Sequence, residues 1–448
     1  MSLESIPQPS VRLNYQWTAA LKKRDEQFLN EQQEIWSFNT DFSCGVQGDV
    51  VEMLFYALFP TVSNRAKKGQ RQAFSTALLM LAQACLFGDD DRCYGFLHAL
   101  SNSRKKTPKR YAVCDFSGTV FKTVLIALSD NDFIQCKEGF RGKGAAHGLT
   151  TLWLPGEEFK FWLDDNLNGV TVERHLKETP ESVQLKNADK VLIDYVDDNH
   201  TLAMRQRIEE GNQKRASVNW SYLPLVDEQS FALDDVRRSI PDESLRCYRV
   251  FREDFRSGGR FYCGAQGLRK AERGTITVNG QPTIELDYKS LHPRLVYNSE
   301  GLEAPVDCYA SESRPREMTK FISLLCINCE SLKQALSALM RRKSMVSDEA
   351  KRHLEAYVEE HKAIEHRFFA LGWKQLQYLD SQLVDLVLTK AVDDDIPVLP
   401  VHDSFIVSTK HAFWLKEQVE GAYQKLMGFE AVVDWEPMPD MSEYLSEA

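Results

Sequence analysis

The chain has 448 residues, of which 43% are hydrophobic and 27% charged, and this composition is typical of a folded globular protein with two or three domains. No apolar run reaches the roughly eighteen residues that cross a bilayer, and the N-terminus lacks a basic start followed by an apolar stretch. We therefore expect a cytoplasmic protein without a membrane partner. The net charge of −10 excludes a protein that is basic throughout.

Positive charge is nevertheless concentrated in one part of the chain. Residues 60–145 hold 14 Lys and Arg against 7 Asp and Glu, a local net charge of +7. A basic segment inside an acidic protein is either a contact surface for nucleic acid or an ordinary solvated surface. The ten cysteines form no regular framework, and Cys326 and Cys329 make a lone CxxC, so free thiols are the simpler interpretation.

The first part of the chain, residues 1–105, is predicted to be a helical region. Residues 15–100 read mainly as helices, as in the run 73–81, which is rich in helix formers. The basic, Pro-containing segment 104–110 then marks a candidate boundary.

Residues 106–160 follow the order of a winged helix. Ser117 can cap a helix with apolar positions through Leu128, residues 133–134 and 150–154 read as strands, and a Gly-rich basic loop at 137–148 lies between them. Arg141 and Lys143 in this loop are the predicted contacts to DNA phosphates, although winged helices also bind proteins.

Residues 161–245 are charged and are predicted to be mostly helical, with one helix at 202–209. The segment carries no pattern of chemical groups that we can assign to a reaction. It is expected to be a connector or a thumb-like arm between the winged-helix module and a third region, 246–448.

The region 246–448 contains three elements that make chemical sense together. In residues 284–294, β-favouring residues lead into Asp287 and then into a helix, which places this acid at a strand end. Residues 396–407 read as a hairpin with His402 and Asp403 at its turn. Arg316 and Lys320 lie four residues apart, on one face of a helix.

These groups suit phosphoryl transfer. Two carboxylates can hold a pair of Mg²⁺ ions roughly 4 Å apart, which activate an attacking hydroxyl and neutralise a triphosphate. Oxygen ligands and few protein carboxylates are what Mg²⁺ prefers. An Arg and a Lys one helical turn apart can clamp the triphosphate.

The same residues resemble the motifs of the family-A DNA polymerases and of the single-subunit phage-type RNA polymerases. Residues 287–294 resemble motif A, Arg316 and Lys320 the R-x3-K of the fingers helix, and residues 401–403 the His-Asp hairpin of motif C. Upstream, residues 259–261, 266–268 and 273 resemble the Gly-Arg and Gln segment that touches primer and template. The resemblance covers residues 250–410.

The resemblance implies an α+β fold, a right-hand polymerase with an antiparallel palm sheet and helical fingers, and roles for individual residues. Asp287 and Asp403, with the backbone carbonyl of Tyr288, are expected to bind Mg²⁺ or Mn²⁺, and Lys320 to act in catalysis. The expected nucleotide-binding residues are Arg316, Lys320, His292, Leu324 and Asn328. The expected primer and template contacts are Arg260, Gln266, Arg273, Arg294, Gln377 and His402.

Several positions depart from the family pattern. His292 stands where family-A DNA polymerases carry the Glu that excludes a ribose 2′-hydroxyl, and Leu324 and Asn328 replace an aromatic residue and a tyrosine. Ser404 replaces the Glu that follows His-Asp in the DNA polymerases, and His-Asp-Ser is the pattern of the phage-type RNA polymerases. The N-terminal half carries no Asp-x-Glu start of a 3′–5′ exonuclease.

The sequence therefore predicts a nucleotidyltransferase, in the first place a DNA polymerase of family-A type from a plasmid, phage or mobile element, without proofreading. Its partners are nucleoside triphosphates and DNA. The alternatives are an RNA polymerase or primase-like enzyme, which Ser404 favours, and a catalytically inactive DNA-binding initiator or regulator. Whether the reaction needs a template stays open.

Overall fold

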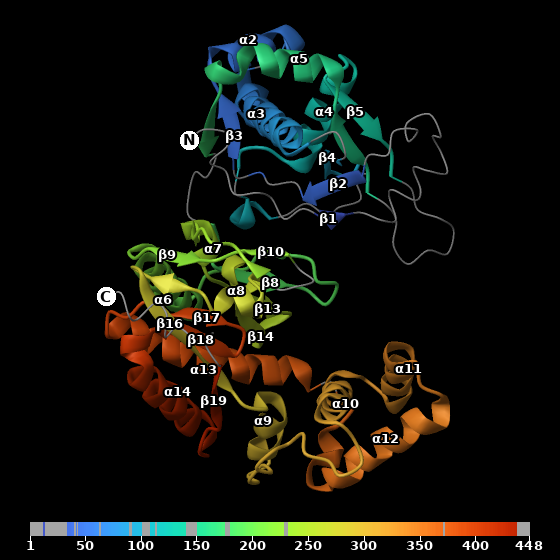
Figure 1. Ribbon diagram of the computed structural model, residues 1–448, viewed down its shortest axis with the longest axis vertical. Helices are drawn as coiled ribbons and strands as arrows, with labels where there is room; N and C mark the ends of the chain where they lie inside the picture. The colour runs from blue at the N-terminus through green and yellow to red at the C-terminus, as the bar shows by residue number, and fades with distance from the viewer. Residues whose placement is uncertain are drawn as a thin grey trace. The chain divides into compact units, whose positions relative to one another are not determined.

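The protein was analysed as a computed structural model, which describes residues 12–13, 34–39, 42, 44–61, 64–88, 92–100, 108–112, 114–139, 150–174, 180–227, 232–370 and 372–436. The chain divides into two compact units, Met1–Pro180 and Glu181–Ala448. Both units combine helices with sheets (Figure 1). None of the helices in the described ranges is long and apolar enough to span a membrane.

The first unit is built around a 24-residue helix, α3. Its elements are β1 (Arg12–Leu13), β2 (Glu34–Asn39), β3 (Cys44–Gln47), α2 (Asp49–Leu58), α3 (Asn64–Phe87), β4 (Arg92–Leu97), η2 (Lys109–Tyr111), α4 (Gly118–Ser129), β5 (Ile134–Lys137), β6 (Leu152–Pro155), α5 (Glu157–Asn166), η3 (Leu167–Gly169) and β7 (Thr171–Arg174). Five strands form one sheet in the order β1-β2-β4-β6-β5, and β3 pairs with β7. Helix α3 packs against β3, β4 and α4, and its apolar residues from Ala73 to Ala84 are buried.

The helix and the hairpin expected in 106–160 are present. Ser117 caps α4, with its hydroxyl accepting a hydrogen bond from the backbone N–H of Val120 (3.4 Å), and the apolar positions from Phe121 to Leu128 are buried. Strands β5 and β6 pair antiparallel. The predicted wing, with Arg141 and Lys143, lies outside the described residues, so the winged-helix assignment stays a prediction.

The mainly helical interpretation of residues 15–100 is wrong in part, because β2, β3 and β4 are strands in that stretch. The parallel pairing of β2 with β4 spans the intervening helices α2 and α3, a long-range contact that local composition does not show. The expected boundaries at 105/106 and 160/161 fall inside the first unit, and the one at 245/246 falls inside the second.

The second unit holds the region with the polymerase-like residues. Its strands are β8 (Val183–Lys186), β9 (Trp220–Tyr222), β10 (Leu225–Asp227), β11 (Ala232–Leu233), β12 (Arg238–Ser239), β13 (Tyr248–Arg252), β14 (Asp254–Tyr262), β15 (Thr277–Val278), β16 (Gln281–Tyr288), β17 (Leu399–Val401), β18 (Ser404–Ser408) and β19 (Val433–Glu436). Its helices are α6 (Asn199–Ala216), α7 (Asp242–Leu245), η4 (Gly264–Gly267), α8 (Lys270–Arg273), α9 (Leu291–Ser299), α10 (Arg316–Asn328), α11 (Leu332–Lys343), α12 (Ser347–Glu360), η5 (Lys362–Arg367), α13 (Trp373–Asp393), η6 (Thr409–His411) and α14 (Ala412–Met427).

An antiparallel sheet of seven strands dominates this unit. Six strands follow the order β12-β9-β15-β16-β18-β17, and β19 pairs with β16 on the edge opposite β18. The turn between β15 and β16 is Asn279-Gly280, and both residues have positive φ (51° and 77°), as a two-residue hairpin of this type requires. The mostly helical interpretation of 161–245 is correct for α6, which contains the predicted helix at 202–209, and wrong for the strands β7 to β12.

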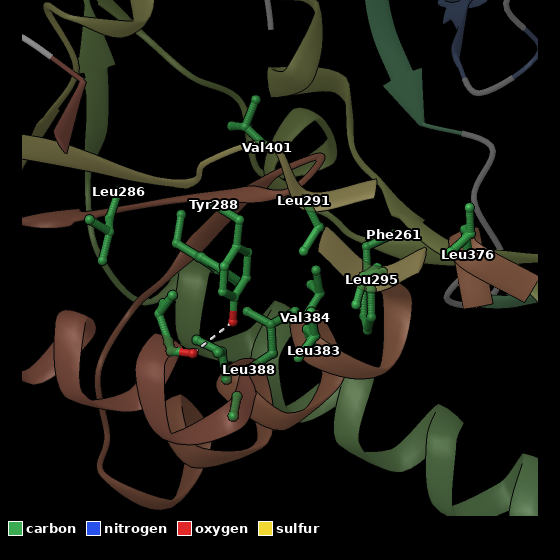
Figure 2. Packing of buried hydrophobic residues seen from close by; sticks show 14 of the residues in the cluster. Phe261, Leu286, Tyr288, Leu291, Leu295, Leu376, Leu383, Val384, Leu388 and Val401 are labelled. Atoms are coloured by element: carbon green, nitrogen blue, oxygen red, sulfur yellow. Dashed lines mark hydrogen bonds between the residues drawn. The ribbon is translucent and has the colours of Figure 1, made fainter. Parts of the chain in front are cut away.

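Beneath the sheet lies a continuous apolar core. Figure 2 shows Tyr288 of β16 among side chains of α9 and α13, where the Tyr288 hydroxyl donates a hydrogen bond to the Val419 carbonyl (2.8 Å). Helix α13 has the predicted core spacing, with Leu376, Leu383 and Val387 buried. One face of β16 therefore packs against helices, and this packing fixes the position of the strand end that carries Asp287.

A buried arginine fastens α13 to the strand pair β13–β14. Arg249 is 1% exposed; its guanidinium donates to the Gly259 carbonyl (2.8 Å) and the Ser381 hydroxyl (3.0 Å) and lies 3.3 Å from an Asp385 carboxylate oxygen. Arg207 of α6 contacts the same carboxylate at 3.2 Å from a more exposed position. The charged groups of Arg249 and Asp385 thus compensate each other inside the unit.

We predict that Arg249→Met destabilises the second unit by about 3 kcal/mol or more, because the substitution leaves buried acceptors and a partly buried carboxylate without their main donor. Hydrogen exchange in peptides from β13 and β14 of the full chain should accelerate by more than about a hundredfold. The control Arg207→Met removes the more exposed of the two arginines and leaves Asp385 paired with Arg249, so it should cost about 1 kcal/mol or less. Equal effects of the two substitutions would contradict this account.

Candidate active site

Asp287 and Asp403 are brought together by strand register. Asp287 is the seventh residue of β16 and pairs with Ser404, the first residue of β18, so Asp403 precedes the direct cross-strand neighbour of Asp287. Directly opposed residues of such a pair lie roughly 5 Å apart. The predictions that Asp287 ends a strand before a helix, and that Asp403 lies in a hairpin turn, are confirmed by β16, α9, β17 and β18.

Both acids adjoin residues with left-handed backbone. Ser290, three residues after Asp287, has φ 54°, and His402, directly before Asp403, has φ 58°. Such a conformation costs a non-Gly residue about 1–3 kcal/mol and persists only where the surroundings impose it. Arg294 is one of those constraints: it is 7% exposed and donates to the carbonyls of Lys289 (3.0 Å) and Val306 (2.6 Å).

Several ionisable groups lie near the Asp403 carboxyl. Burial raises the pKa of its carboxyl and the nearby Asp380 carboxylate raises it further, whereas the nearby His292 and Arg260 side chains act in the opposite direction. A divalent cation placed here would relieve the repulsion between carboxylates. The charge distribution therefore favours a cation at this end of the hairpin.

The donor set can be compared with the ligands that metals prefer. Asp287 and Asp403 could supply carboxylate oxygens and Tyr288 a backbone carbonyl, whereas no group of three or more His, Cys, Asp and Glu side chains within the described ranges could hold a metal ion. Few carboxylates plus water and substrate phosphates fit Mg²⁺ or Mn²⁺, and they do not fit a closed structural zinc site. None of the ten cysteines, all of which lie in the described ranges, forms a disulfide.

The expected nucleotide-binding residues of the fingers helix share one face of α10. Arg316, Lys320, Leu324 and Asn328 recur every four residues; the first three are exposed, and Leu324 is 52% exposed. The Arg316 guanidinium lies 3.2 Å from the Asp307 carboxylate and stays 45% exposed. The helix thus presents two cations followed by an apolar and an amide side chain, in the order expected from the sequence.

His292 does not stand alone at the beginning of α9. Its Nε2 lies 2.9 Å from Nη2 of Arg260, and Arg260 Nε donates to the Asp380 carboxylate at 2.6 Å. Because an arginine can only donate, Nε2 of His292 accepts in this contact. His292, expected to contact the nucleotide sugar, and Arg260, expected to contact the primer, are therefore hydrogen-bonded to each other.

The other expected primer and template residues differ in their availability. Gln266 donates from Nε2 to the carbonyls of Phe261 (3.2 Å) and Pro400 (3.3 Å), and Arg273 pairs with Glu285 at 3.1 Å. These side chains, like that of Arg294, are engaged inside the unit.

His402 is exposed in the hairpin turn, and Gln377 is partly buried on α13, three residues before Asp380. They come from β17–β18 and from α13 respectively, so the expected contacts derive from more than one element.

Sequence reasoning missed two residues of this neighbourhood. Tyr309 has its ring 5.1 Å from the Arg316 guanidinium, and burial, followed by the Cys308 and Asp403 charges, raises the pKa of its hydroxyl to about 12. Asp380 is 1% exposed and binds Arg260. The available signal was weak: Asp380 is an acid within the apolar spacing of a helix, and Tyr309 merely follows Asp307 by two residues.

Comparison with known proteins adds little. No protein-family model and no curated protein matches the chain. Among solved structures it is similar to the "POL domain of Pol1 from M. smegmatis complex with DNA primer-template and dNTP", with 14% identity over 43% of this chain and a TM-score of 0.30. The match spans 48% of that chain, about half its length. This TM-score is too low to establish a common fold, so function has to follow from the residues themselves.

The crowded charge at Asp403 gives a prediction for the metal-free protein. A carboxyl whose pKa is raised by folding stabilises the native state below its unfolded pKa, near pH 4, and this contribution is lost as the pH rises through the folded value. Asp403→Asn, which cannot ionise, should therefore be more stable than wild type at pH 7 in a chelator. The gain should disappear at about pH 3.5, as measured by urea unfolding. A less stable Asn variant at pH 7 would contradict the assignment.

Proposed function

We propose that the second unit is a nucleotidyltransferase that extends the 3′-hydroxyl of a nucleic acid with nucleoside triphosphates. The observation that carries the proposal is the register of β16 against β18, which brings Asp287 beside Asp403 at one end of a hairpin. The exposed cations of α10 support it, because they form a face suited to a triphosphate. In the right-hand arrangement that we propose, the seven-stranded sheet is the palm and α10 belongs to the fingers.

The reaction joins the 3′-oxygen of the primer to the α-phosphorus of the incoming nucleotide. The bond from that phosphorus to the pyrophosphate breaks, pyrophosphate leaves, and the hydroxyl proton passes to water. Asp287, Asp403 and the Tyr288 carbonyl would hold divalent cations, which would supply activation of the hydroxyl and neutralisation of the leaving group. Arg316 and Lys320 bind the triphosphate, with Arg316 exchanging the Asp307 carboxylate for phosphate oxygens.

The nucleotide that we propose is a deoxynucleoside triphosphate, and the polymer is DNA, as for a polymerase of family-A type. Support comes from the engagement of His292: with Nε2 accepting from Arg260, this nitrogen is not available to a ribose 2′-hydroxyl. The ring then acts on the sugar by its bulk. Leu324, which stays exposed on α10, gives the base an apolar surface.

We predict that Asp287→Ala and Asp403→Ala each reduce nucleotide incorporation by a factor of at least about 10³, because both carboxylates hold the cations on which the transfer depends. The measurement is extension of a labelled primer with dNTPs or rNTPs and Mg²⁺. Asp394→Ala is the matched control: this carboxylate pairs with Lys390 and Trp414 at the end of α13 and should leave the rate unchanged. Activity retained by either folded variant would refute the two-carboxylate mechanism.

We predict that His292→Ala lowers the ratio of kcat/KM for dNTP to that for rNTP by roughly tenfold to a hundredfold, because a smaller side chain admits the 2′-hydroxyl. Use of dNTP should change little. A rise in the ratio would mean that His292 recognises the ribose, and would favour an RNA polymerase. An unchanged ratio would place His292 away from the sugar.

A further inference from the structure

Three charged or polar side chains from three separate elements meet beside the hairpin of Asp403. Arg260 comes from β14, His292 from α9 and Asp380 from α13, and 120 residues separate Arg260 from Asp380. Asp380 is 1% exposed, whereas the side chains of Arg260 and His292 are 24% and 20% exposed. The acid thus lies in the interior, and the two basic groups lie between it and solvent.

The contacts connect Asp380 to His292 through Arg260. Arg260 Nε donates to Oδ2 of Asp380 at 2.6 Å, and Arg260 Nη2 lies 2.9 Å from His292 Nε2. The same Oδ2 is 3.7 Å from His292 Nε2, too far for a hydrogen bond but close enough for attraction. Nη2 of Arg260 also lies 2.5 Å from Oδ2, so Asp380 contacts two nitrogens of the planar guanidinium and thereby fixes the direction in which Nη2 reaches His292.

We propose that Asp380 is a positioning residue for sugar selection: from α13 it fixes Arg260, and through Arg260 it holds the His292 ring against the nucleotide sugar. This inference rests on the proposed function. An imidazole at the start of a helix can adopt several rotamers, and a ring free to rotate would leave room for a 2′-hydroxyl. The ring bound by Arg260 is confined to one orientation, and bulk discriminates between sugars only when it stays in place.

A purely structural role for Asp380 makes a different prediction. A buried ion pair stabilises or destabilises the fold whatever the substrate, so its loss would lower dNTP and rNTP use together. A positioning role changes the ratio between the two substrates. Asp385 offers a matched control, since it is an acid on the same helix that also pairs with arginines, but with Arg207 and Arg249 and not with the Arg260 that contacts His292.

The experiment measures kcat/KM for one dNTP and its rNTP in primer extension by the full chain, for wild type, Asp380→Asn, Asp385→Asn, His292→Ala and the double variant Asp380→Asn/His292→Ala. We expect Asp380→Asn to lower the dNTP-to-rNTP ratio by about tenfold, equivalent to about 1.4 kcal/mol. Asp385→Asn should lower the melting temperature without moving the ratio. The double variant should match His292→Ala within about threefold, because both changes disable the same ring.

The outcomes separate the inference from the function on which it rests. No incorporation of either nucleotide by folded wild type overturns the proposed function, and the inference with it. Incorporation by wild type with an unchanged ratio in Asp380→Asn, or additive effects in the double variant, overturns the inference alone. If Asp380→Asn does not fold, Arg260→Lys is the deciding variant. A lysine keeps the positive charge beside Asp380 but lacks the planar guanidinium that also reaches His292. This variant must lower the dNTP-to-rNTP ratio of kcat/KM, and an unchanged or higher ratio overturns the inference.

Discussion

The second unit depends on the pairing of acids on α13 with arginines from the strand pair β13–β14. Asp380 and Asp385 lie where a helix of this spacing would otherwise be apolar, and each binds an arginine: Arg260 and Arg249 respectively. A buried carboxylate without a partner is costly, so the pairs of Asp380 and Asp385 with arginines favour the observed register of α13 against β13 and β14. Apolar packing alone would let the helix shift along the strand pair, whereas the ion pairs specify which residues lie opposite each other. Arg260 also contacts His292 in the first turn of α9. The constraint on α13 therefore extends to the neighbourhood of the candidate catalytic acids.

Two left-handed residues show how the fold holds its site. Ser290 and His402 each adopt a conformation that a short peptide would avoid, and each lies within three residues of a candidate catalytic acid. The surroundings that impose them are the core beneath β16 and β18, where Tyr288 and Phe405 are buried, and the carbonyl contacts of Arg294. Packing energy is thus used to keep the turn after Asp287 and the hairpin turn at Asp403 in place. The crowded charge at Asp403 adds to the same cost, as expected for a site arranged for binding and not for stability.

The sequence predicted the elements whose signals are local. The strand ending in Asp287, the hairpin of Asp403, helix α10 and the cap at Ser117 all follow from patterns within about twelve residues, and all are present. Short strands such as β2 and β4 were missed because they are defined by a partner more than fifty residues away. The link from Asp380 to Arg260 was missed for the same reason. Roles assigned by motif position were also incomplete, because position does not reveal that a side chain such as Arg273 is bound within the unit.

Ser404 shows why such internal contacts matter for function. Its place after Asp403 is what favoured an RNA polymerase, yet it is 4% exposed and its hydroxyl donates to the Glu285 carboxylate and lies 2.9 Å from the Val401 carbonyl. Glu285 in turn pairs with Arg273. An acid in place of Ser404 would set two carboxylates against each other across neighbouring strands, with one arginine to compensate them. The neutral residue therefore follows from the charge on β16, whatever the sugar of the substrate. Because the charge on β16 accounts for Ser404, this residue does not decide between ribose and deoxyribose, and in the proposed function that role falls to His292, which Arg260 holds in place.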